Sequence, residues 1–291
     1  MKSTLGEKWF YSINYVLLSL IGLSCLLPLI HIAALSLSDA HAVLSGAVTL
    51  WPKNWSLQSY SSLIEGTRVV TAFRNNVIIT VVGVGLSMAV TILTAYPLSK
   101  KYFMGRRFFL LAAVFTMMFA GGTIPNYLVI KSLGIINTYW AIWLPGLVST
   151  YNLLVLRTFF LNVPDEIDEA ARMDGCSEWR LLVQMILPLS MPVLATLALF
   201  YGVGYWNTFL SVLIYINDTD KYNLTVLVQN MIKSQTVLQE VVTSQTDSTG
   251  DITAEGIKAA GVLVLIVPML AVYPFLQKYF VKGVMLGSVK G

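Results

Sequence analysis

The chain has 291 residues, of which 56% are hydrophobic and 12% charged, with a mean hydropathy of +0.71 and a net charge of +4. About a quarter of the residues in a soluble domain are charged, so this composition excludes an ordinary soluble protein and indicates a membrane protein. The small positive charge gives no reason to expect a nucleic-acid partner.

Six stretches of the chain carry no Asp, Glu, Lys or Arg and are long enough to cross a bilayer. They are residues 9–38, 75–99, 108–130, 132–156, 181–217 and 259–277. A helix needs about 20 apolar residues to span the hydrocarbon core, and it keeps its backbone groups hydrogen-bonded there. The sequence therefore predicts an all-α membrane protein with six transmembrane helices, at about 13–36, 76–99, 108–129, 136–157, 186–214 and 259–279.

The positions of Lys and Arg predict how these helices are oriented. With the N-terminus inside, twelve of the 19 Lys and Arg residues fall on the cytoplasmic side and seven outside. The run KKYFMGRR at 100–107 contributes most to this bias, which is typical of cytoplasmic loops. Both termini are therefore expected in the cytoplasm, with residues 1–12 as a cytoplasmic segment before one membrane domain, 13–291. The first span exceeds the signal-peptide core of about 7–15 residues, so it is expected to remain uncleaved.

The interiors of the predicted spans carry no charge, which argues against several classes of membrane protein. Ion-coupled carriers usually need an intramembrane carboxylate or a similar relay, and intramembrane hydrolases need a nucleophile with a base or a metal. Cys25 and Cys176 are predicted at different depths, and no Cys/His cluster indicates a metal site. The phosphate-binding pattern GxxxxGK[ST] is absent, so the chain is not expected to hydrolyse ATP itself.

The segment 162–185, between the fourth and fifth predicted spans, is unusually polar for this chain. It holds six of the 15 acidic residues. Pro164 suits the first turn of a helix, Gly175 favours a C-terminal stop, and Ser177 is a good N-cap for a second helix. The local sequence thus predicts a helix, a turn and a second helix. A solvated loop helix without a partner remains the alternative.

This segment resembles the EAA loop of ATP-binding-cassette importer permeases. The pattern of that family is Glu-Ala-Ala, roughly three residues, Gly, roughly ten residues, and an apolar residue with Leu-Pro; here EAARMDG stands at 169–175 and ILPL at 186–189. The runs MPVLATLALFYGVGYWNTF (191–209) and QKYFVKGVMLGSVKG (277–291) resemble the maltose-type, carbohydrate branch. The resemblance covers nearly the whole chain and is closest to six-span permeases for aldouronate and other oligosaccharides. Cys176 is one departure, because the family more often has Ala there.

The resemblance implies that residues 13–291 form a permease domain whose loop 162–185 is a cytoplasmic coupling helix docked on an ATPase. Small side chains let such a helix approach another protein closely, and a carboxylate accepts a charge-assisted hydrogen bond from a basic partner residue. The coupling residues implied in this way are Glu169, Ala170, Ala171, Asp174 and Gly175. Lys282 and Lys290 in the C-terminal tail are implied as a second ATPase contact; a tail that only satisfies the inside-positive rule is the alternative.

Polar and aromatic residues within the spans are the candidates for a sugar path. Sugar rings stack their C–H faces on aromatic rings, and their hydroxyls need hydrogen-bond partners. The candidates are Tyr201, Tyr205, Trp206 and Asn207 in the fifth span and Asn126 in the third, where GGTIPNY predicts a kink. Interfacial aromatic belts and close helix packing are the alternative explanations of this pattern.

The partners implied by the resemblance are a second, similar permease, two ATPase subunits that bind ATP and Mg²⁺, and an extracellular sugar-binding lipoprotein. The lipoprotein would meet the outer loop, 215–258. The chain itself is expected to be no enzyme and to hold no cofactor or metal, and its predicted location is the bacterial cytoplasmic membrane.

The sequence thus predicts the permease subunit of an ATP-driven importer of oligosaccharides that works by alternating access. A permease for an amino acid, a peptide or a polyamine remains an alternative, because an EAA loop does not separate these solutes. A channel or carrier without an ATPase is a further alternative. The sequence does not name the sugar: seven outer Lys and Arg against eight outer Asp and Glu give no electrostatic preference for an acidic one.

Overall fold

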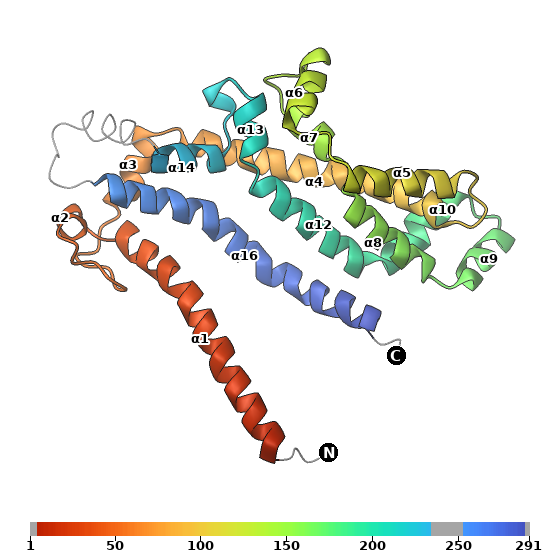
Figure 1. The fold of residues 1–291 in the computed structure, drawn as a ribbon, viewed down its shortest axis with the longest axis horizontal. Coiled ribbons are helices and arrows are strands. Elements are labelled where there is room, and N and C mark those ends of the chain that lie inside the picture. Colours follow the sequence, from red (N-terminus) through yellow and green to blue (C-terminus); the bar gives the residue numbers. More distant parts are fainter. Residues whose placement is uncertain (1–4, 234–252, 289–291) are drawn as a thin grey trace. The chain divides into compact units, whose positions relative to one another are not determined.

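A computed structural model describes residues 5–233 and 253–288, and regular structure there is helical apart from one isolated β-bridge between Ser38 and Trp55 (Figure 1). The helices are α1 (Leu5–Ser36), α2 (Ala40–Leu44), α3 (Gln58–Gly66), α4 (Val69–Ser99), α5 (Arg106–Met118), α6 (Thr123–Ser132), α7 (Trp140–Gly146), α8 (Thr150–Leu161), α9 (Asp165–Met173), α10 (Glu178–Leu181), the π-helix η1 (Leu182–Ile186), α11 (Leu187–Leu189), α12 (Met191–Trp206), α13 (Leu210–Tyr215), the 3₁₀ turn η2 (Thr219–Lys221), α14 (Leu224–Lys233) and α16 (Ala254–Ser288).

Three segments of the described helices are long and apolar enough to cross a membrane without a break. They are Gly6–Ser36 in α1, Val69–Ser99 in α4 and Ala254–Val272 in α16. These segments overlap the predicted spans 13–36, 76–99 and 259–279. Up to six crossings result if each of three bent helix pairs also counts as one span.

The three bent pairs occupy the places where single helices were expected. α5 and α6 meet at 118°, α7 and α8 at 50°, and the segment Glu178–Leu189 meets α12 at 83°. The predicted helix 186–214 is also interrupted a second time, because α12 ends at Trp206 and α13 begins at Leu210. The intervals free of charge therefore mark apolar segments, but only three of the six correspond to continuous helices in the residues that the structure describes.

Backbone conformation and side-chain hydrogen bonds, some of them from distant residues, accompany these interruptions. Gly122 precedes α6 with a φ of +85°, a conformation that glycine adopts without a steric penalty. The hydroxyl of Ser149 caps α8. At the end of α12, Nδ2 of Asn76 and Oγ1 of Thr225 donate to the Trp206 carbonyl at 3.5 and 3.1 Å. These side chains replace the backbone N–H that a further helical turn would supply.

The chain divides into two compact units: Met1–Val70 with Leu227–Val267, and Thr71–Val226 with Pro268–Gly291. In the first unit, the Ser36 hydroxyl at the end of α1 lies 3.0 Å from the Tyr60 hydroxyl of α3. A Cβ at Gly256 in α16 would lie 2.5 Å from Oγ of Ser59 in α3. Close backbone approach at this glycine therefore joins α3 to α16 within the unit.

In the second unit, α4 and α12 lie side by side (Figure 1). Hydroxyl groups link them at two levels: Tyr201 to Thr91 at 2.7 Å, and Tyr205 to Ser87 at 2.9 Å. The Tyr205 ring also lies against the α4 backbone at Gly83, where a Cβ would come within 2.8 Å of the ring. The pairing of these helices therefore depends on two hydroxyl pairs and one glycine.

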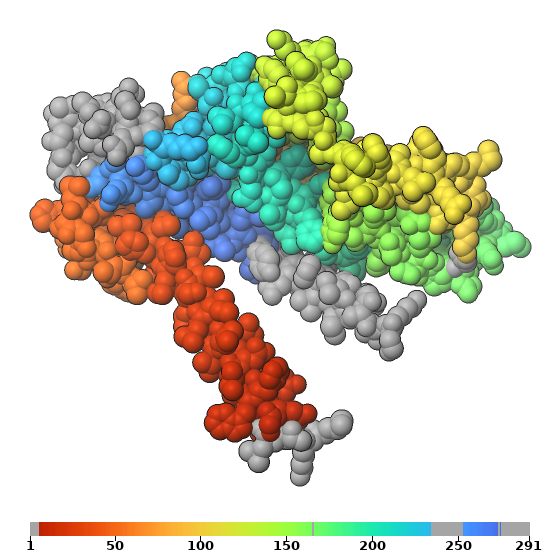
Figure 2. Space-filling view, viewed as in Figure 1, coloured from red at the N-terminus to blue at the C-terminus, as the bar shows by residue number. Residues whose placement is uncertain are grey.

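The helix α8 lies centrally in the second unit, and Figure 2 shows its green segment against the yellow segment of α5. Oγ1 of Thr150, at the start of α8, donates to the Ala113 carbonyl of α5 at 3.2 Å. Leu153 and Leu156 of α8 belong to the same buried cluster as Leu197 of α12, and all three are at most 2% exposed. Thus α8 packs between α5 and α12.

The contact at Gly83 gives the first testable prediction. Gly83→Ala places a methyl group inside the Tyr205 ring contact, and overpacking of this kind costs about 1–3 kcal/mol. The thermal midpoint of the purified protein in detergent is expected to fall by about 2–4 °C for each kcal/mol lost.

Gly85→Ala is the matched control, since no heavy atom lies within 4 Å of its added Cβ. That variant gains the helix propensity of Ala, about 0.5–1 kcal/mol, without the clash. Equal midpoints for the two variants would show that the Tyr205 ring is not held against α4.

Candidate functional site

The EAA hairpin, residues 165–181, consists of α9, a tight turn and α10. Gly175 takes a φ of +72° just after α9, and the Cys176 N–H donates to the Ala171 carbonyl at 2.9 Å. This is the Schellman arrangement, in which a left-handed residue closes a helix. The hydroxyl of Ser177 then caps α10. The predicted sequence of helix, turn and helix is thus present, and Gly175 has the left-handed conformation expected of a residue that ends a helix.

The two sides of α9 face different surroundings. Glu169, Ala170 and Asp174 are exposed, and Met173 is 88% exposed. Ala171, in contrast, is 1% exposed and packs into the core of its own unit. Of the two alanines expected to admit a close partner, the structure therefore brings only Ala170 to the surface. The reading of the sequence missed Met173, although its spacing of three and four residues from Ala170 and Glu169 places it on the same helical face.

A groove of about 630 Å³ lies in the second unit, between the break that separates α7 from α8 and the helix α12. Its lining is aromatic and polar: Ile142, Pro145, Gly146, Ser149, Tyr151, Asn152, Phe200, Tyr201, Gly204, Tyr205, Thr208 and Ser211. None of these lining residues is charged. The groove thus offers ring faces, hydroxyls and one amide, which are the groups that a neutral part of a sugar needs.

Two of the predicted path residues, Tyr201 and Tyr205, line this groove. Both are more than 90% buried, and their hydroxyls are engaged with α4. The Tyr201 hydroxyl also accepts a hydrogen bond from the Ser149 N–H at 3.0 Å, at the break before α8. These tyrosines therefore present ring surface to the groove, while their hydroxyls hold its walls together.

The other three predicted path residues lie elsewhere. Trp206 is 6% exposed, and its ring meets that of Phe73 edge to face at 6.1 Å. Asn207 is exposed at the end of α12, and its Nδ2 donates to the Val203 carbonyl at 2.9 Å. Asn126 is exposed in α6. None of the three lines the groove, so the structure does not bring the five predicted residues together.

Sequence reasoning gave no role to several residues that line the groove. Phe200 and Gly204 are four residues apart in α12, which places them on one helical stripe, and this spacing was the available signal. No heavy atom lies within 4 Å of a Cβ built on Gly204, so this glycine leaves space open along the stripe. Asn152 comes from α8, and its approach to α12 depends on a bend that the sequence did not reveal.

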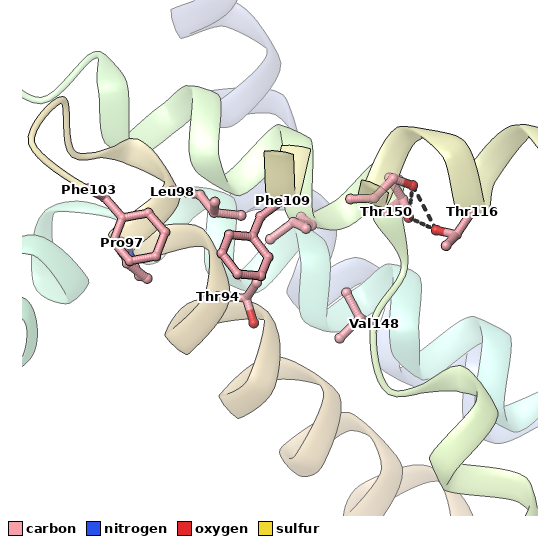
Figure 3. A pocket seen from close by; sticks show the side chains of 10 residues that line it. Thr94, Pro97, Leu98, Phe103, Phe109, Thr116, Val148 and Thr150 are labelled. Atoms are coloured by element: carbon pink, nitrogen blue, oxygen red, sulfur yellow. Dashed lines mark hydrogen bonds between the residues drawn. The ribbon is translucent and has the colours of Figure 1, made fainter. Parts of the chain in front are cut away.

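A second cavity, of about 400 Å³, lies where α4, α5 and α8 meet (Figure 3). Pro97, Leu98, Phe103 and Phe109 give it an apolar wall, and threonine hydroxyls stand at its edge. The Thr150 hydroxyl there is turned to the Ala113 carbonyl and so is not free to serve a ligand. This cavity suits an apolar group better than a sugar.

The remaining predicted contacts are only partly covered by the structure. Lys282 belongs to α16, whereas Lys290 lies outside the described residues. Residues 234–252 of the predicted outer loop lie outside them as well. Among the residues that the structure describes, no group of three His, Cys, Asp or Glu side chains could hold a metal ion.

The hydroxyl of Tyr201 gives the second prediction. Tyr201→Phe leaves the Thr91 hydroxyl and the Ser149 N–H without this partner, at a cost of about 1–2 kcal/mol. The thermal midpoint in detergent is expected to fall by several degrees. Tyr151→Phe is the control, because Tyr151 lines the same groove but is 55% exposed. A shift no larger than that of the control would mean that Tyr201 does not hold the break before α8.

Comparison with known proteins places the chain in a family. The family described as "Binding-protein-dependent transport system inner membrane component" matches residues 7–286. The polygalacturonan/rhamnogalacturonan transport system permease protein YtcP of Bacillus subtilis (strain 168) is 38% identical over 285 residues, which cover 98% of this chain and 99% of that protein. Protein LplC of the same organism is 38% identical over 293 residues, covering 100% and 98%.

A solved structure agrees with these relatives. The crystal structure of a bacterial ABC transporter involved in the import of the acidic polysaccharide alginate contains a chain that superposes with a TM-score of 0.90 at 30% identity, covering 96% of this chain and 99% of that one. The chain therefore belongs to the family of binding-protein-dependent transport system inner membrane components and is a multi-pass permease subunit of the cytoplasmic membrane.

Proposed function

We propose that this chain is the permease subunit of an ATP-driven importer of oligosaccharides, with oligosaccharides that contain uronic acids as the first substrates to test. The family match over residues 7–286 carries the proposal. In the full transporter the chain pairs with a second permease, and two ATPase subunits bind ATP and Mg²⁺. An extracellular sugar-binding lipoprotein delivers the substrate.

The substrate class is supported by two independent likenesses. The similar Bacillus subtilis permease is named for polygalacturonan and rhamnogalacturonan, and the similar solved transporter imports alginate. Galacturonan and alginate are both polymers of uronic acids, whose rings carry carboxylates beside ordinary hydroxyls. An oligosaccharide of this kind is therefore a stronger candidate than an amino acid, a peptide or a polyamine.

The groove supports a sugar path through this chain. Phe200 and Tyr151 supply aromatic surface, and Asn152, Thr208 and Ser211 supply hydrogen-bonding groups. No Lys or Arg lines the groove. The groove would therefore bind the ring faces and hydroxyls of the sugar, and other subunits would bind its carboxylates. The absence of charged residues from the interiors of the predicted spans agrees with this assignment of carboxylate binding to other subunits.

The EAA hairpin supports a partner that supplies energy. An exposed methionine beside an exposed carboxylate, as at Met173 and Glu169, offers apolar area and a charge to a docking protein. The ion pair between Lys100 and Asp168 brings the basic loop 100–107 next to the hairpin, which supports assigning both to the cytoplasmic side. Both termini and residues 1–12 share that side in the proposed topology of six spans, and Lys282 and Lys290 belong to a second ATPase contact.

The proposed mechanism is alternating access. ATP binding closes the ATPase pair and moves the hairpins of the two permeases, and the spans then open outward to accept sugar from the binding protein. ATP shifts this equilibrium only through its different affinity for the two states. Hydrolysis resets the pair, and the permease itself carries out no chemical step.

The third prediction tests the coupling residues. Glu169→Lys and Gly175→Pro are expected to lower ATP-dependent oligosaccharide uptake by at least about tenfold, because breaking a buried charge contact at an interface costs about 2–5 kcal/mol. Proline also forbids the positive φ of Gly175. Uptake is measured with radiolabelled oligogalacturonides in cells, with the amount of permease in the membrane as the reference.

Glu65→Lys is the control for charge, since it makes the same change at an exposed position of α3. Full uptake in both hairpin variants would reject the coupling role. Uptake that survives ATP depletion and collapses with the ion gradient would instead identify a carrier without an ATPase.

The fourth prediction tests the groove. Gly204→Leu fills open space beside Phe200 and Tyr205, so uptake is expected to fall by roughly tenfold while folding is kept, as expected when a blocked site costs more than 1.4 kcal/mol. Gly85→Leu is the matched control, because it also has open space around its Cβ but does not line the groove. Equal uptake in the two variants would remove the groove from the sugar path.

A further inference from the structure

The loop that follows α4 is fixed to the EAA hairpin by an ion pair. Nζ of Lys100 lies 2.5 Å from Oδ1 of Asp168 in α9, and the two side chains are only 15% and 20% exposed. The same ammonium group stands over the Tyr96 ring, 4.9 Å from its centre. Partial burial makes this pair less sensitive to salt than an ordinary surface pair, and removal of either partner leaves a charge poorly solvated.

A second ion pair crosses the turn of the hairpin. Nη2 of Arg172 in α9 donates to Oε1 of Glu178 in α10 at 2.5 Å and to the Tyr102 hydroxyl at 2.8 Å. The guanidinium also lies over the Tyr102 ring at 5.0 Å and is 3.7 Å from Oδ2 of Asp168. Arg172 therefore joins both helices of the hairpin to the loop after α4.

Glu178 receives hydrogen bonds from both sides of this junction. The Tyr96 hydroxyl in α4 donates to Oε2 at 2.8 Å, and the Tyr102 hydroxyl lies 3.1 Å from Oε1. Burial, and then the bond to Glu178, raises the pKa of Tyr102, and the neighbouring Glu178 raises the pKa of Arg172. Tyr102 thus stays protonated and Arg172 stays charged around neutral pH.

The covalent connection from the hairpin to α12 is not a continuous α-helix. It runs through the π-helix η1, Leu182–Ile186, and then through a bend of 83° before α12. A π-helix is rare and occurs mostly as a single turn, and a sharp bend marks a place where the hydrogen-bond ladder of a helix is interrupted. On the α4 side, Tyr96 lies within a helix of 31 residues, and the proline inside that helix, Pro97, follows Tyr96, so the stretch from Tyr96 back to Ser87 is uninterrupted.

The same helix α4 reaches the proposed sugar groove. Its Thr91 and Ser87 bind the hydroxyls of Tyr201 and Tyr205, whose rings line the groove. Tyr96 follows Ser87 by nine positions in α4, which corresponds to a rise of roughly 13 Å. One rigid element therefore connects the hairpin to the groove.

We propose that Lys100, Asp168, Arg172 and Glu178, with the hydroxyls of Tyr96 and Tyr102, form a strap that makes the EAA hairpin and the end of α4 move as one body. The strap consists of positioning residues and transmits the displacement of the hairpin to the groove through α4. This inference rests on the proposed function, because it assumes that an ATPase moves the hairpin.

A cross-linking experiment on the complete transporter in its native membrane tests the strap. Lys100→Cys and Asp168→Cys are combined in a chain that also carries Cys25→Ser and Cys176→Ala, and the pair is joined with a short bifunctional methanethiosulfonate. The double variant without the linker is expected to lose roughly tenfold in uptake, the size of a typical coupling between sites, while it still purifies with its partner subunits. The linker is expected to restore uptake, because it replaces the ion pair by a covalent connection that moves with both elements.

Two results would overturn the strap. The first is full uptake in the double variant before linking, and the second is uptake that stays low or falls further after linking, which would mean that the two elements separate during transport. Lys100→Cys alone, treated with the same reagent, controls for modification at one site and is expected to show no recovery.

The Glu169→Lys variant is measured in parallel and separates this inference from the proposed function. Full uptake in Glu169→Lys would reject the coupling role of the hairpin itself. Loss of uptake in Glu169→Lys together with full uptake in the unlinked double variant would reject only the strap.

Discussion

The hydroxyl groups of Tyr201 and Tyr205 supply the contacts on which the second unit depends. Each binds a hydroxyl of α4, and Tyr201 also accepts from the Ser149 N–H, so a single side chain connects α4, α8 and α12. Within a bilayer no water replaces a lost partner, and such bonds fix the register of neighbouring helices more strictly than apolar packing alone. Because the same rings line the groove, the proposed sugar path and the contacts that hold its walls share the same side chains.

The helix α9 has two different sides within its nine residues. Ala171 turns inward to the core and Asp168 to the loop after α4, while Glu169 and Met173 turn outward. A helix of this length has little stability by itself, so its orientation depends on what its inner side contacts. The outward surface of α9, to which the proposed function assigns the ATPase, is therefore oriented by residues on the opposite side of the helix.

The sequence predicted some parts of this architecture and not others, for identifiable reasons. Charge-free intervals located the apolar segments because a buried charge is costly in lipid. Gly175 and Ser177 revealed the turn of the hairpin because their roles are set by local backbone geometry. The break between α7 and α8 escaped prediction, since it depends on a bond from Ser149 to a tyrosine distant in sequence. Trp206 was expected in the path because its residue type suits sugars, but its ring packs on Phe73, a contact that only the tertiary structure reveals.

The broken helix formed by α7 and α8 also has a consequence for how the chain enters the membrane. The two pieces contain 7 and 12 residues, a rise of roughly 10 and 18 Å, so neither crosses the hydrocarbon core alone. The backbone N–H at the break is satisfied by Tyr201, which leaves the ribosome 52 residues after Ser149. During synthesis the Ser149 N–H therefore lacks this partner until Tyr201 has been made. The hydrogen bond that joins this break to α12 can therefore form only after both segments have been synthesised.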